Sequence, residues 1–182
     1  MDLRTERTKR SITSAFLELR KHKPIEKITV KELSEVAFIN KATFYTHYHD
    51  IYDLADQMEN EFMESIIAEL PHPESIITDP ALATKELADA LIDKVHISSI
   101  LFSGSRQSYL SEKIYIALMN YITSRYPEQE FTLRRSIVLS IIIQGCFHAY
   151  QSFTTDGNRD EVIEILGDVG TCLKTNFLEQ TS

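Results

Sequence analysis

Residues 41–49 carry side chains that could bind a nucleic acid. The segment reads Lys-Ala-Thr-Phe-Tyr-Thr-His-Tyr-His and holds a lysine, hydroxyl groups and imidazoles but no carboxylate. A lysine can bind phosphate oxygens, whereas hydroxyl and imidazole groups can hydrogen-bond to base edges in the major groove. These residue types fit DNA contact.

A helix over this segment would place most of the polar groups on one side. At 100° per residue, Phe44 and Tyr48 share one face and are expected to pack inward. The opposite face holds small or polar side chains, namely Ala42, Thr43, Thr46 and His49, with Tyr45 and His47 at its margins. We expect this outward face to meet DNA.

Two short helices and a corner position the segment. Thr29 and Glu32 have the spacing of a capping box, which starts the first helix. Asn40 is a good N-cap for the second helix, expected over 41–48. Two helices of about eight residues around a tight corner are typical of a helix-turn-helix, whose second helix enters the major groove.

The stretch 28–54 resembles the DNA-binding segment of the tetracycline-repressor (TetR/AcrR) family of bacterial transcription regulators. The closest match is Lys-Ala-Thr-Phe-Tyr at 41–45, followed by aromatic residues and by the Asp-x-x-Asp-Leu helix start at 50–54. The resemblance covers residues 1–60. Phe38 stands where the family usually has a turn glycine, and Ile51 stands where many members have a lysine.

The resemblance implies a homodimeric transcription repressor that binds a palindromic operator in double-stranded DNA and is released by a small-molecule effector. The effector would tilt the fourth helix and change the separation of the two recognition helices. The expected DNA contacts are Thr29, Asn40, Lys41, Thr43, Tyr45, Thr46 and His49. Among them, Tyr45 would place its hydroxyl on the phosphate backbone.

Charge is distributed unevenly along the 182 residues, whose net charge is −8. Residues 1–50 hold 10 Lys and Arg against 7 Asp and Glu, a net of +3, and residues 51–182 hold 9 against 20, a net of −11. We therefore expect a DNA-binding domain over 1–50 and an acidic domain, kept away from DNA, over 51–182.

Hydrophobic periodicity predicts an all-α fold, in which a three-helix DNA-binding domain precedes a helical bundle for ligand binding and dimerisation. No alternation of period two is long enough for a strand. The expected helices outside the helix-turn-helix cover residues 5–21, 50–70, 80–95, 108–126, 131–153 and 158–178, with a short helix within 97–106.

The last two expected helices are candidates for the subunit interface. The helix over 131–153 is apolar on more than one side and must be covered on several faces. Glycines inside helices allow close helix–helix approach at a cost of about 1 kcal/mol each. Two such helices from each subunit would form a four-helix bundle through Ile142, Gly145, Ala149, Ile163, Gly167 and Gly170. The same features would also serve a core within one chain.

The middle region should hold an effector cavity if the resemblance extends that far. Aromatic and polar residues on otherwise apolar helices are its candidate lining: His96, Phe102, Tyr109, Tyr115, Met119, Gln144 and His148. An ordinary core is the alternative interpretation of each. A further alternative is a DNA-binding regulator whose C-terminal domain binds a protein partner, which an exposed apolar patch over a filled core would favour.

Other function classes find little support in the sequence. It lacks the G-x-S-x-G, H-E-x-x-H and C-x-x-C motifs and a phosphate-binding glycine loop, so we expect no enzyme and no cofactor. A small helical enzyme, the rival from another class, predicts no salt-dependent DNA binding. His47 and His49 would diverge by about 200° on a helix and build no metal site.

Cellular location is suggested by cysteine usage and by apolar length. Cys146 and Cys172 give no disulfide framework, and the chain begins without a signal-peptide pattern, which fits the cytoplasm. The strongly apolar stretch 137–147 is about half as long as a membrane span needs. We expect a cytoplasmic protein that does not enter a membrane.

Overall fold

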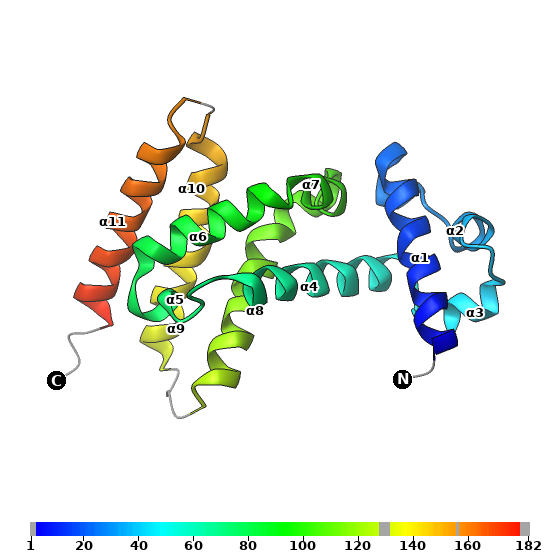
Figure 1. The fold of residues 1–182 in the computed structure, drawn as a ribbon, viewed down its shortest axis with the longest axis horizontal. Helices are drawn as coiled ribbons and strands as arrows, with labels where there is room; N and C mark the ends of the chain where they lie inside the picture. Colours follow the sequence, from blue (N-terminus) through cyan, green and yellow to red (C-terminus); the bar gives the residue numbers. More distant parts are fainter. Residues whose placement is uncertain (1–2, 128–131, 156, 179–182) are drawn as a thin grey trace. The chain divides into compact units, whose positions relative to one another are not determined.

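The computed structural model describes residues 3–127, 132–155 and 157–178, and these ranges are all-helical with no strand (Figure 1). The predicted all-α class is confirmed. The α-helices are α1 (Leu3–His22), α2 (Val30–Val36), α3 (Lys41–Tyr45), α4 (Ile51–Glu69), α5 (Ser75–Thr78), α6 (Pro80–Asp93), α7 (Val95–Leu101), α8 (Leu110–Arg125), α9 (Leu133–Ser140), α10 (Cys146–Phe153) and α11 (Arg159–Phe177).

Three further helical turns complete the described chain. Ile25–Lys27 and Gly104–Tyr109 are 3₁₀-helical, and the π-helical turn Ile141–Gly145 joins α9 to α10 without a break. The helix expected over 131–153 is therefore one run from residue 133, while its expected first residue, Phe131, lies outside the described residues. The short helix α5 and both 3₁₀ turns have no counterpart in the sequence predictions.

The chain divides into two compact units that alternate along the sequence. Unit 1 comprises Met1–Phe62 and Val95–Tyr109, and unit 2 comprises Met63–Lys94 and Leu110–Ser182. This division differs from the predicted boundary at residue 50. The reason is that α7 and the turn after it pack with α1 and with the first part of α4, whereas the second part of α4 belongs to unit 2.

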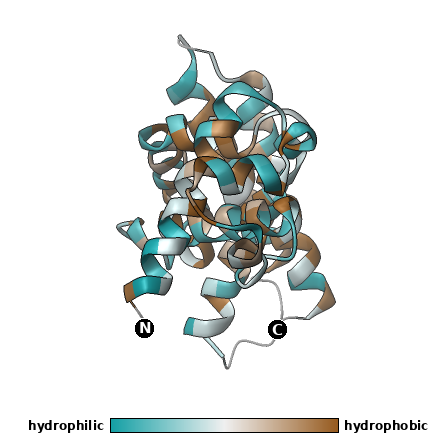
Figure 2. Ribbon diagram, turned by 90° about the vertical axis from the view of Figure 1, so that its right-hand side faces the viewer, coloured by the Kyte–Doolittle hydropathy of each residue, from teal (hydrophilic) through white to brown (hydrophobic). Residues whose placement is uncertain are grey.

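The core of unit 1 takes one apolar face from each of its helices. Ile12 and Phe16 of α1, Leu33 of α2, Phe44 of α3 and Leu54 of α4 are each at most 1% exposed. Burying a side chain of this size contributes about 1.5–3 kcal/mol. The predicted inward direction of Phe44 is confirmed. Figure 2 shows hydrophobic and hydrophilic residues recurring along the helices, as expected for amphipathic elements.

Arg20 of α1 forms hydrogen bonds with the C-terminal end of α7 and the residues after it. Its Nη2 donates hydrogen bonds to the backbone oxygens of Ile100 and Ser103, at 3.2 and 3.0 Å, and to the Ser103 hydroxyl at 2.6 Å. The guanidinium is buried, and that burial lowers the pKa of Arg20. The Arg20 side chain thus donates hydrogen bonds to carbonyl groups that have no partner within α7 at its C-terminus.

Arg106, in the turn after α7, forms ion pairs with two carboxylates of α4. Its Nε donates to Oε1 of Glu59 at 2.7 Å, and its Nη2 donates to the second oxygen of Glu59 and to Asp56 Oδ1 at 2.8 Å. Glu59 is completely buried, and its hydrogen bond raises the pKa of Arg106. Glu59 and Asp56 lie 47 and 50 residues from Arg106 in sequence, so no local sequence pattern predicts these contacts.

In unit 2, two glycines let α11 pack closely on α6. A Cβ at Gly167 would lie 2.9 Å from the Cα and Cβ of Ala81, and one at Gly170 would lie 3.0 Å from the Cβ of Pro80. Such short contacts leave room only for glycine at Gly167. The close approach predicted for these glycines therefore occurs within one chain, which is the alternative that the sequence analysis left open.

Candidate nucleic-acid interface

Side-chain caps fix the starts of α2 and α3 where the sequence predicts them. Thr29 Oγ1 accepts a hydrogen bond from the Glu32 N–H at 3.2 Å, and Asn40 Oδ1 accepts one from the Thr43 N–H at 2.7 Å. Each cap contributes about 1 kcal/mol. The Glu32 carboxylate pairs with Lys23, so only half of the expected capping box is present.

The sorting of residues 41–49 into an inward and an outward face is confirmed. Phe44 and Tyr48 are buried, with ring centroids 5.6 Å apart. Ala42, Tyr45, Thr46 and His49 are exposed, and Thr43 is half-buried. The helix itself is shorter than expected, because α3 ends at Tyr45 and the N–H groups of the next residues turn back to the carbonyls of Thr43 and Phe44.

The predicted DNA-contact residues keep accessible polar groups. Asn40 and Lys41 are exposed beside the outward face, and Thr29 is exposed at the start of α2. The hydroxyl of Thr29 accepts its cap hydrogen bond, so its own hydrogen can still go to a phosphate oxygen. By contrast, the Thr43 hydroxyl donates to Asn40 Oδ1 at 2.9 Å and the Thr46 hydroxyl to the Thr43 carbonyl at 2.7 Å. These two hydroxyls are thus prepared to accept hydrogen bonds, for example from base amino groups.

The carboxylates nearest to this face are engaged at the start of α4. Asp50 Oδ1 accepts from the Asp53 N–H at 2.8 Å, and Asp53 accepts from the His49 N–H at 2.8 Å and from Gln57 at 3.0 Å. The hydrogen bonds from Gln57 and His49 lower the pKa of Asp53. The two aspartates therefore accept hydrogen bonds from backbone N–H groups at the start of α4 and do not lie on the outward face of α3.

The corner between α2 and α3 is a Schellman turn with an unusual residue at its left-handed position. The Ile39 N–H donates to the Ser34 carbonyl at 3.0 Å and the Phe38 N–H to the Glu35 carbonyl at 3.3 Å. Phe38 has φ of 56°, the conformation that glycine normally supplies there. The expected departure at Phe38 thus changes the residue and keeps the turn geometry, at a cost of about 1–2 kcal/mol.

Ile51, the second departure from the family pattern, is buried in the core of unit 1. It is the first residue of α4, and its side chain points away from solvent. Both its residue type and its inward direction prevent this side chain from binding a phosphate.

A separate small cavity lies in unit 2. Its volume is about 60 Å³, and its wall consists mainly of aliphatic side chains from α6, α8 and the continuous run from α9 to α10. Representative lining residues are Leu87, Leu91, Leu118, Ile143, Phe147 and Tyr150. Sites for drug-sized ligands measure about 300–1,000 Å³. In its present form the cavity has room only for a very small molecule.

None of the seven residues predicted to line an effector cavity lines this one. Gln144 and His148 each follow a lining residue by one position, which turns them away by about 100°. Tyr115 and Met119 flank the lining residue Leu118 on α8. His96, Phe102 and Tyr109 belong to unit 1, where Phe102 packs on Phe62 with centroids 6.3 Å apart. The prediction selected polar and aromatic residues, whereas the wall of this cavity is mainly aliphatic.

The few polar groups in the cavity wall are already occupied. The Thr84 hydroxyl donates to the Pro80 carbonyl at 2.7 Å, and Cys146 Sγ lies 3.8 Å from the Leu166 carbonyl. Burial raises the pKa of the Cys146 thiol, which keeps it neutral. No Asp, Glu, Lys, Arg or His lines the cavity. Its chemistry therefore favours a small, uncharged, apolar occupant.

Four of the six predicted interface residues are buried within their own subunit. Ile142 and Ile163 are 8% exposed, Ile142 lines the cavity, and Gly167 and Gly170 contact α6. Their contacts lie within one chain, which is the alternative that the sequence analysis left open for them. The two others differ: Ala149 is half-buried, and Gly145 is exposed with nothing within 4 Å of a Cβ built on it.

No three His, Cys, Asp or Glu side chains come together as a metal site within the described ranges 3–127, 132–155 and 157–178. The sequence matches no protein-family model and no curated protein.

The strain at Phe38 gives a first prediction. Phe38→Gly should raise the free energy of unfolding by about 0.5–1 kcal/mol, because relief of left-handed strain exceeds the entropy that glycine adds to the unfolded chain. Urea denaturation followed by circular dichroism measures the change. Phe38→Ala is the matched control, since it removes the same ring and retains the strain. Equal stability of the two variants would show that the backbone at this position is not strained.

Proposed function

We propose that this protein is a sequence-specific regulator of transcription that binds double-stranded DNA through a helix-turn-helix formed by α2, the corner at Phe38 and α3. The observation that carries the proposal is the outward face of residues 41–49, which is exposed, hydroxyl-rich and free of carboxylates. It is presented by a capped helix behind a Schellman corner. The resemblance of residues 28–54 to the tetracycline-repressor family supports the same function.

The electrostatics of the chain also support DNA binding. The first 50 residues carry a net of +3 within a protein of net −8, so attraction to phosphates is confined to the part that holds α3. Lys41 stands exposed at the start of α3, where it would reach a phosphate beside the major groove. Tyr45 and His49 extend the same face with a phenol and an imidazole.

Lys41→Ala tests this interface. Loss of one phosphate contact should weaken binding to all duplex sequences by a similar factor and should reduce the slope of log K against log salt by about 0.9. Fluorescence anisotropy with a labelled duplex, at several salt concentrations, measures both quantities.

Lys85→Ala is the matched control, because it removes an exposed lysine from α6 of unit 2. It should leave affinity and slope as in the wild type. An unchanged slope for Lys41→Ala would place Lys41 away from the DNA backbone.

We further propose that the functional unit is a homodimer joined through α9, α10 and α11. Ile137 and Ile141, with Ile165 and Val169 of α11, are each between 45% and 54% exposed. Exposed apolar patches of this kind mark interaction surfaces. Gly145 continues the patch one turn beyond Ile141 and would let a partner helix approach closely. A second copy of the same face would complete a four-helix bundle.

A membrane is the other environment that such a face could meet. By length and composition the run Leu133–Phe153 suffices to cross one, and only 22% of its most apolar window is buried. Burial of its other side against α8, α11 and the cavity favours a protein partner. A dimer covers the exposed isoleucines without removing the helix from unit 2.

Ile141→Lys tests the dimer. The charge would stand within the proposed interface, so the variant should become monomeric at concentrations where the wild type is dimeric, and its helical content should stay the same. Analytical ultracentrifugation measures the association state. Ile92→Lys on α6, at a similarly exposed isoleucine, is the control and should remain dimeric. A dimer of unchanged affinity in Ile141→Lys would contradict this interface.

The regulator responds, in this proposal, to a small apolar effector in the cavity of unit 2. A specific observation favours a second possibility, because about 60 Å³ is far below the volume of an ordinary ligand site. In that case the acidic C-terminal unit would bind a protein partner. A rise in thermal stability on adding small uncharged compounds would support the effector.

A further inference from the structure

We propose that Phe38 and the basic first turns of α1 form a second DNA-contacting surface beside α3, with the Phe38 ring packed on apolar parts of the duplex at the edge of the half-site. The inference rests on the proposed DNA-binding function. It adds to that function a contact outside the recognition helix, made by a residue that the predicted set of DNA contacts does not contain.

Phe38 combines two unfavourable features at one residue. Its ring is 96% exposed, the highest value among the large hydrophobic side chains that the structure describes, and its backbone has φ of 56°. Glycine or asparagine would hold the same turn with less strain. Because the ring packs on nothing within unit 1, the fold does not account for the presence of phenylalanine. A contact that the ring makes on binding DNA would account for it.

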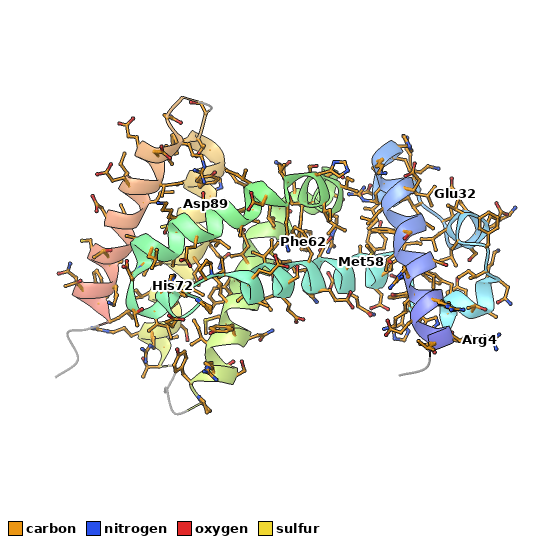
Figure 3. The ribbon with its side chains drawn as sticks, in the orientation of Figure 1. Arg4, Glu32, Met58, Phe62, His72 and Asp89 are labelled. Carbon is orange, nitrogen blue, oxygen red and sulfur yellow. The ribbon has the colours of Figure 1, made fainter. Side chains whose placement is uncertain are left out.

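The surroundings of Phe38 are basic on one side. The corner and α1 bound two shallow grooves, the first lined by Leu3, Arg4, Arg7 and Thr8 and the second by Arg10, Ser11 and Ser14, with Phe38 in both. Figure 3 shows Arg4 at the N-terminal end of α1. Guanidinium groups bind phosphates with paired hydrogen bonds.

One acidic residue lines these grooves. Glu18 lies in the second, where it pairs with Lys21 at 2.8 Å. Its charge is thus offset on the same helix. Three arginines beside an exposed aromatic ring complement a polyanion with apolar sugar and base surfaces better than they complement an acidic or a neutral protein.

The position of Phe38 in the chain places it close to DNA once α3 is bound. It precedes the N-cap Asn40 by two residues, a span of at most about 7 Å. With α3 in the major groove, the corner must lie at the groove edge, where deoxyribose rings and thymine methyl groups offer apolar surface. The ring can pack there while Arg4, Arg7 and Arg10 neutralise the neighbouring phosphates.

Binding of the full-length protein to a duplex containing its selected site tests the inference. Phe38→Ala and Phe38→Gly should each bind about five- to tenfold more weakly than the wild type, the size expected for loss of one aromatic contact. Their salt slopes should equal the wild-type slope, because phenylalanine carries no charge. Arg7→Ala should instead reduce the slope by about 0.9.

Two controls separate the ring from folding and from backbone geometry. Ile92→Ala removes an exposed apolar side chain from unit 2 and should bind as the wild type does. Phe38→Gly should bind weakly although it melts at or above the wild-type temperature, which excludes unfolding as the cause. Phe38→Ala with wild-type affinity overturns the inference, whether or not Phe38→Gly is weakened. A wild type that binds no duplex at low salt overturns the proposed function itself, so the two failures are distinct.

Discussion

The buried pairing of Arg106 with Glu59 is the constraint on which the arrangement of this chain depends. Breaking such a pair leaves an uncompensated buried charge, at a cost of about 3–5 kcal/mol. With the hydrogen bonds of Arg20, it holds residues 95–109 against α1 and α4, within the unit that carries α3. The same segment is continuous with α6 and α8, two of the helices that line the cavity. Residues 95–109 are therefore held within unit 1, although the chain on either side of them, α6 and α8, belongs to unit 2.

The corner at Phe38 shows how the same unit uses strain. Backbone hydrogen bonds and the Asn40 cap retain a turn that usually requires glycine, so the exposed aromatic ring stands next to α3 at a cost in stability. Residues held in unfavourable backbone conformations concentrate at functional sites. The strain at Phe38, the basic side of α1 and the outward face of α3 are consistent with a single nucleic-acid surface.

The sequence predicted best what short-range patterns determine. The caps at Thr29 and Asn40, the inward Phe44 and Tyr48 and most of the helices follow from spacing within a few residues. It failed where partners lie far apart. Glu59 and Arg106 are separated by 47 residues, and nothing near Gly167 indicates Ala81 as its neighbour. On the continuous run from α9 to α10, Ile143 lines the cavity whereas the predicted Gln144 does not, because one residue turns a helix face by about 100°.

Selection of bound sequences from random duplex DNA, followed by footprinting of the enriched duplex, tests the central claim most directly. The account predicts enrichment of a two-fold symmetric sequence whose half-sites lie about one helical turn or more apart, with protection of both half-sites in the major groove. Enrichment of no sequence, together with binding that is equally weak for every duplex, would contradict it.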